Sequence, residues 1–88
     1  MTVDCRKYSE ALSKSLNTIE TIWNRYEDKD RAVTEFAVSS GIPIVVVCLF
    51  VKEKFPHFES IDNSIKRMIS FYGYTKIIHF NGSEFTLP

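Results

Sequence analysis

The chain has 88 residues, which is room for one hydrophobic core and excludes a second domain. Its composition, 44% hydrophobic, 14% aromatic and 25% charged, is that of a packed globule and not of a disordered segment. Eleven basic side chains balance eleven acidic ones, so the chain lacks the overall positive charge of strong nucleic-acid binders, and any such binding must be local.

Cysteine content and apolar runs predict where the protein works. Two cysteines, Cys5 and Cys48, make a poor disulfide framework, and Met1 is followed by polar residues with no apolar signal-peptide region. We therefore expect an intracellular protein, either cytoplasmic or nuclear. The longest apolar run, residues 42–51, is about half of the roughly 20 residues that a membrane-spanning helix needs, so no membrane association is expected.

The first predicted element is one long amphipathic helix from about Asp4 to Glu27. Apolar side chains recur there at intervals of four and three, which is the periodicity of one helix face. Within a single domain, 1–88, we expect residues 1–28 to form this helix and residues 30–88 to form the rest of the core. The apolar stripe either packs on its own domain or carries self-association into a homodimer. Its candidate interaction residues are Leu12, Leu16, Ile19, Trp23 and Tyr26.

Two more helices are expected in the middle of the chain. Asp30 is a plausible N-cap for the second helix, which Gly41 would end. Pro43 suits the first turn of a third helix from Ile44 to Lys54. The β-branched valines of that run would also suit a buried strand, but its length favours a helix.

A fourth helix and a hairpin complete the predicted elements. Ser60 can cap a helix over residues 61–72, and Gly73 can stop it. The pattern then changes to period two on either side of Asn81 and Gly82, a pair typical of hairpin turns because both residues tolerate positive φ. We expect these two as the central turn residues, with Ile78 or Phe80 opposite Phe85. The predicted fold class is mainly α with a C-terminal β-hairpin.

The fourth helix carries the polar pattern that is most informative about function. Its apolar residues share one face, and a polar face lies opposite at the same helical spacing. Arginine and lysine can reach guanine edges or phosphates, asparagine can pair with adenine, and serine can bond a phosphate oxygen. The alternative is an ordinary solvated helix face. The polar residues are Asn63, Lys66, Arg67 and Ser70.

The order of elements, an apolar helix, a polar-faced helix and a tight hairpin, is that of a winged helix-turn-helix. Residues 50–58, Phe-Val-Lys-Glu-Lys-Phe-Pro-His-Phe, resemble the second helix and following turn of the forkhead class. Residues 63–66, Asn-Ser-Ile-Lys, resemble the start of that family's recognition helix, and residues 85–88, Phe-Thr-Leu-Pro, resemble the strand that closes its wing. The first forkhead helix is not recognisable, so the resemblance favours winged-helix architecture over forkhead descent.

The resemblance implies a DNA-facing surface. It places Asn63 and Lys66 in the major groove, and Arg67 where the family usually has a base-contacting histidine. If the domain binds DNA, we expect the wing to add His79, Asn81 and Ser83 near the DNA backbone, with Lys76 as a further phosphate contact.

A competing helix-turn-helix placement spans Val33 to Phe50. Its recognition helix would begin Pro43-Ile44-Val45-Val46, which offers no hydrogen-bond donors to bases, so we assign these residues to the core.

Enzymatic patterns are weak, and the chain is not expected to be an enzyme or to hold a cofactor. His57 and His79 have no cysteine or carboxylate at zinc-ligand spacing, and no glycine-rich phosphate loop is present. The leading expectation is a small intracellular winged-helix regulator that binds double-stranded DNA. The alternative is a winged-helix protein-interaction module, such as an adaptor subunit or a small inhibitor of another protein, without DNA binding.

Overall fold

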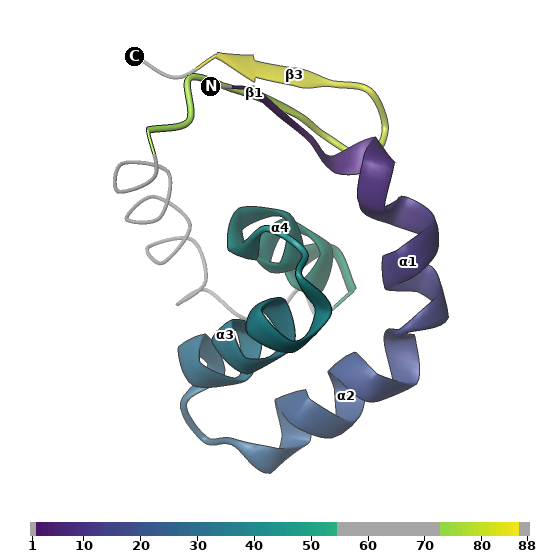
Figure 1. Ribbon diagram of the computed structural model, residues 1–88, viewed down its shortest axis with the longest axis vertical. Helices are drawn as coiled ribbons and strands as arrows, with labels where there is room; N and C mark the ends of the chain where they lie inside the picture. Colours follow the sequence, from purple (N-terminus) through teal and green to yellow (C-terminus); the bar gives the residue numbers. More distant parts are fainter. Residues whose placement is uncertain (1, 55–72, 87–88) are drawn as a thin grey trace.

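The computed structural model describes residues 2–54 and 73–86. These residues are mainly helical, with one small three-stranded sheet (Figure 1). The elements, in chain order, are β1 (Thr2–Asp4), the 3-10 helix η1 (Cys5–Tyr8), α1 (Ser9–Lys14), α2 (Leu16–Arg25), α3 (Lys29–Ser40), α4 (Ile44–Lys54), β2 (Lys76–Ile78) and β3 (Glu84–Thr86). The helix expected over residues 61–72 lies outside the described residues.

The expectation of one long N-terminal helix is wrong. Residues 2–4 form a strand instead, because Val3 pairs with Ile77 in a parallel ladder. Asp4 then caps η1 by accepting a hydrogen bond from the backbone N–H of Arg6 at 3.0 Å. Ser15, at φ −97° and ψ 9°, separates α1 from α2. This break lets the two helices bend around α3 and α4, as Figure 1 shows.

The two middle helices form as expected, with one correction. Helix α3 is capped by Asp28, whose side chain accepts the Asp30 backbone N–H at 3.1 Å, so Asp30 is not the cap. Gly41, at φ 74°, ends α3 in the left-handed conformation typical of a glycine stop. Helix α4 spans the predicted residues Ile44–Lys54.

The core gathers on α4. Four consecutive residues of this helix, 45–48, are at most 1% exposed, which explains why its sequence shows no polar face. Phe50 and Val51 extend the buried surface, and Phe36 and Ala37 of α3 pack in the same cluster. The assignment of residues 43–46 to the core is confirmed for Val45 and Val46, which are buried, while Pro43 and Ile44 are half-buried. A three-residue turn joins α3 to α4.

The sheet lies at one end of the molecule, with strand order β1-β2-β3 (Figure 1). Strands β1 and β2 are parallel, so the helices between them form the crossover that parallel pairing requires. Strands β2 and β3 form the expected antiparallel hairpin. Among the described residues, no helix combines the length and apolarity needed to cross a bilayer.

Candidate interaction surfaces

The hairpin turn differs from the one that the sequence predicts. Ile77, and neither Ile78 nor Phe80, lies opposite Phe85. The Gly82 N–H donates to the His79 carbonyl at 3.0 Å, and the His79 N–H donates to the Ser83 carbonyl at 2.7 Å. Gly82 has φ 88°, and among the described residues only glycines have positive φ. The loop therefore has three residues, 80–82, with the left-handed glycine last, as in a hairpin that ends in a glycine bulge.

The residues expected to contact a DNA backbone are spread over this hairpin. Lys76 stands on β2, where its ammonium forms an ion pair with Glu84 at 3.2 Å. Asn81 and Ser83 are exposed at the tip, and the Asn81 Oδ1 atom accepts the Ser83 backbone N–H at 2.9 Å. The polar residues expected on the recognition helix, Asn63, Lys66, Arg67 and Ser70, lie outside the described residues.

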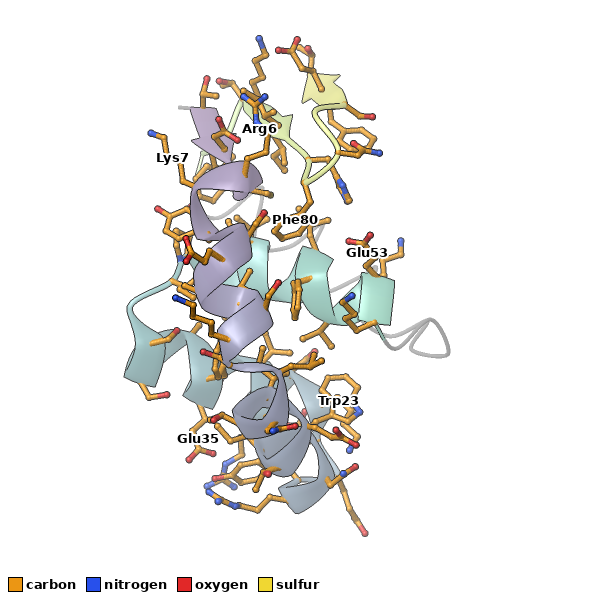
Figure 2. The ribbon with its side chains drawn as sticks, turned by 90° about the vertical axis from the view of Figure 1, so that its right-hand side faces the viewer. Arg6, Lys7, Trp23, Glu35, Glu53 and Phe80 are labelled. Carbon is orange, nitrogen blue, oxygen red and sulfur yellow. The ribbon has the colours of Figure 1, made fainter. Side chains whose placement is uncertain are left out.

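His79 is more enclosed than a backbone-contacting residue should be. Its ring makes edge contacts with Phe80 and Phe85, at centroid distances of 5.4 and 6.1 Å. Its Nδ1 atom is buried and has no hydrogen-bond partner within the part of the chain that the structure describes. Phe80 anchors the turn to the core, because its ring meets that of Phe50 edge-on at 5.8 Å, and Figure 2 shows it between the hairpin and α4.

Two basic side chains near the sheet, Arg6 and Lys76, are paired with carboxylates. Arg6 binds Asp4 through two hydrogen bonds, from Nε at 3.0 Å and from Nη2 at 2.9 Å. The side-chain hydrogen bond from Arg6 lowers the pKa of Asp4, which keeps that carboxyl ionised. Lys7 lies beside Arg6 at the sheet end of the molecule (Figure 2). Together with the Lys76 ion pair, this pattern leaves little positive charge on the hairpin for a phosphate backbone.

The apolar stripe of the N-terminal helices mostly faces inward. Leu12, Ile19 and Trp23 are at most 4% exposed and belong to the core cluster, and Tyr26 packs against it. Leu16 is 38% exposed. The alternative that this stripe packs on its own domain is therefore confirmed for most of its residues. Homodimer formation is not tested by the structure of a single chain.

An open apolar hollow of about 300 Å³ lies where α3 turns into α4. Val38, on the last turn of α3, is 79% exposed on its border. The described residues that line it carry no charged side chain; they are Thr34, Ala37, Val38, Ile42, Pro43, Ile44 and Tyr74. A hollow of similar volume on α2, about 290 Å³, is lined instead by Asn17, Thr18, Thr21, Ile22 and Arg25.

Sequence reasoning missed this hollow, although Val38 gives a signal for it. In α3 the buried side chains are Val33, Phe36 and Ala37 with Ala32, and Val38 stands off that face. An apolar residue outside the apolar stripe of an amphipathic helix indicates a second contact surface. Tyr74 lies far from Val38 in sequence, so only the tertiary structure shows that both residues line the same hollow.

Neither thiol is a candidate nucleophile. Cys5 and Cys48 are 0% and 1% exposed. Burial raises the pKa of Cys5 to about 11 and that of Cys48 to about 12, so both stay protonated near neutral pH. In residues 2–54 and 73–86, no group of three or more His, Cys, Asp or Glu side chains could hold a metal ion.

Comparisons with family models, with curated proteins and with solved structures find no significant match to this chain. Winged-helix architecture therefore stays a prediction from the sequence.

Proposed function

We propose that this domain is a protein-interaction module that receives an apolar anchor side chain of a protein partner in the hollow between α3 and α4. The observation that carries the proposal is the 79% exposure of Val38 on the border of that hollow. A single exposed valine is ordinary on a protein surface. Next to an open hollow with apolar walls, however, it forms the kind of pocket that accepts a buried anchor at an interface.

Charge supports a protein partner over a nucleic acid. The whole chain carries eleven basic and eleven acidic side chains. Around the sheet, Arg6 and Lys76 each have a carboxylate partner, at 2.9 and 3.2 Å. Neutralised side chains release few phosphate counterions, which are the main source of affinity in nucleic-acid binding. The lining that the described residues contribute to the hollow is uncharged, which favours an apolar group over a phosphate.

A peptide-display selection against the whole chain tests the proposal. We expect the selected peptides to share a large apolar residue and to lose binding to Val38→Asp, because a carboxylate on the border penalises apolar contact. Val38 is exposed, so the variant should keep its fold. Thr18→Asp, on the polar hollow of α2, is the matched control. Selected peptides without a common apolar residue, or with equal affinity for both variants, would contradict the proposal.

The second candidate is a DNA-binding regulator, favoured by the polar spacing of Asn63, Lys66 and Arg67 in the sequence. About three phosphate contacts would give a slope of log affinity against log salt of roughly three in magnitude. Replacing Lys66 and Arg67 together by alanine should flatten that slope. If the chain does not bind a random duplex at low salt, the DNA-binding candidate is rejected and the interaction-module proposal is retained.

A further inference from the structure

We propose that Asn81, at the tip of the hairpin, is a site of self-modification. Its side-chain amide converts to a carboxylate through a cyclic imide formed with the backbone nitrogen of Gly82. The products are aspartate and its isomer isoaspartate, in which the backbone runs through the former side chain. This inference is independent of which partner the domain binds.

Access at the tip permits the ring closure. Asn81 is exposed, and the attacking nitrogen belongs to a glycine. A Cβ atom built on Gly82 would meet no atom within 4 Å apart from those of its two chain neighbours, so no other part of the described structure crowds this position. With no side chain on the attacking residue, no Cβ atom hinders the approach of the nitrogen to the side-chain carbonyl carbon of Asn81.

One hydrogen bond in the turn favours the reaction, and another opposes it. The Ser83 backbone N–H donates to Asn81 Oδ1 at 2.9 Å. It therefore points at the oxygen on which negative charge develops as the nitrogen attacks, and it stabilises that charge. The Gly82 N–H, in contrast, donates to the His79 carbonyl at 3.0 Å, and this bond must open before the nitrogen loses its proton. Local opening of the hairpin tip should therefore control the rate.

The chemistry needs only water. Hydroxide removes the Gly82 N–H proton, the nitrogen bonds to the Asn81 Cγ atom, and the side-chain amide leaves as ammonia after taking a proton from solvent. Water then adds to either carbonyl of the imide and breaks one C–N bond. Cleavage at the side-chain carbonyl gives aspartate, and cleavage at the backbone carbonyl gives isoaspartate. The net change is asparagine plus water to a carboxylic acid plus ammonia.

Both products change the hairpin. Either one adds a negative charge to a chain whose basic and acidic side chains balance, at a position three residues before Glu84 in sequence. Isoaspartate also lengthens the backbone by one carbon inside a three-residue loop. The pairing of His79 with Ser83, whose N–H to carbonyl distance is 2.7 Å, cannot keep its geometry after that insertion.

Peptide mapping by mass spectrometry, after incubation of the whole chain at mildly alkaline pH, tests the proposal. Asn17 and Asn24 are internal controls, because both lie in α2 and are followed by residues with side chains. We expect Asn81 to react on the order of tenfold faster or more, which corresponds to a barrier lower by about 1.4 kcal/mol. An enzymatic isoaspartate assay should give a signal that Asn81→Gln abolishes.

Two results would overturn the proposal. One is an unmodified Asn81 under conditions that convert a short Asn-Gly peptide. The other is conversion of Asn81 at the same rate as Asn17 and Asn24.

Discussion

At the scale of single residues, Lys29 links the end of α2 to the start of α3 through hydrogen bonds to backbone carbonyls. Its Nζ atom donates to the carbonyls of Trp23 and Tyr26, at 2.6 and 2.8 Å. It also lies 5.0 Å from the centroid of the Trp23 ring. The charge therefore satisfies backbone groups at the C-terminal end of α2 and contacts a core aromatic ring, which a surface lysine does not do.

We predict that Lys29→Met lowers the free energy of unfolding by about 2 kcal/mol, because charge-assisted hydrogen bonds to partly buried carbonyls are lost. Urea denaturation at neutral pH measures the change. Lys14→Met is the matched control: the Lys14 side chain is 74% exposed and pairs only with Glu10 on its own helix, so its loss should cost less than about 0.5 kcal/mol. Equal effects of the two variants would show that Lys29 acts as an ordinary surface lysine.

At the scale of elements, the hairpin shows how far local sequence determines a turn. The Asn-Gly pair correctly predicts a reversal at residues 81 and 82. It does not fix the loop length, because a two-residue turn and a three-residue loop both accept glycine at positive φ. The position of Phe80 favours the three-residue loop, because its ring packs against that of Phe50 at a centroid distance of 5.8 Å while its backbone lies in the loop. That long-range contact is invisible in the local pattern.

We predict that Gly82→Val lowers the free energy of unfolding by roughly 1 to 2 kcal/mol, because a β-branched side chain is strained at φ 88°. A Cβ atom at this position would meet nothing within 4 Å beyond its chain neighbours, so the expected cost comes mainly from the backbone conformation. Thermal denaturation gives the size of the effect. Ser83→Ala is the control, since the hydrogen bonds of Ser83 in this turn come from its backbone. A Gly82→Val variant as stable as the original chain would mean that the tip relaxes to negative φ.

Some helix ends could also be predicted from local sequence, whereas others depend on tertiary packing. Helix α4 and the stop at Gly41 were predictable because length, Pro43 and a left-handed glycine are local signals. The break at Ser15 was not, because the apolar spacing of Leu12 and Ile19 continues across it and both side chains are buried. Periodicity records which residues face the core, and it does not record where the helix axis bends.

For the whole molecule, the largest departure from expectation is the strand at the N-terminus. Three residues, 2–4, show too little alternation to predict a strand, and their partner β2 begins at Lys76. Pairing over such a separation depends on the crossover that the helices form. The candidate site shares this property, because Tyr74 reaches the hollow beside Val38 only once the chain has folded. The sequence correctly predicts that His79, Asn81 and Ser83 lie in a hairpin. It does not predict the ion pair of Lys76 with Glu84, because that contact depends on the register of the two strands.

The last prediction concerns assembly. Since Ile19 and Trp23 are buried in their own domain, the N-terminal stripe offers a second copy little more than Leu16, at 38% exposure. One partly exposed leucine is far from the roughly 1,200 Å² of buried surface that a stable interface needs. We therefore expect a monomer in sedimentation experiments at micromolar concentration.

Two variants separate packing within the domain from packing between copies. Leu16→Glu should change neither sedimentation nor, by more than about 0.5 kcal/mol, the free energy of unfolding, as for other surface substitutions. Ile19→Ala should cost about 3 kcal/mol, because it removes a side chain that is 3% exposed and leaves a cavity in the core. Both effects can be read from denaturant titrations at two protein concentrations, which should coincide for a monomer. A dimer that Leu16→Glu dissociates, with an unfolding midpoint that rises with concentration, would instead identify the exposed end of α2 as the interface between copies.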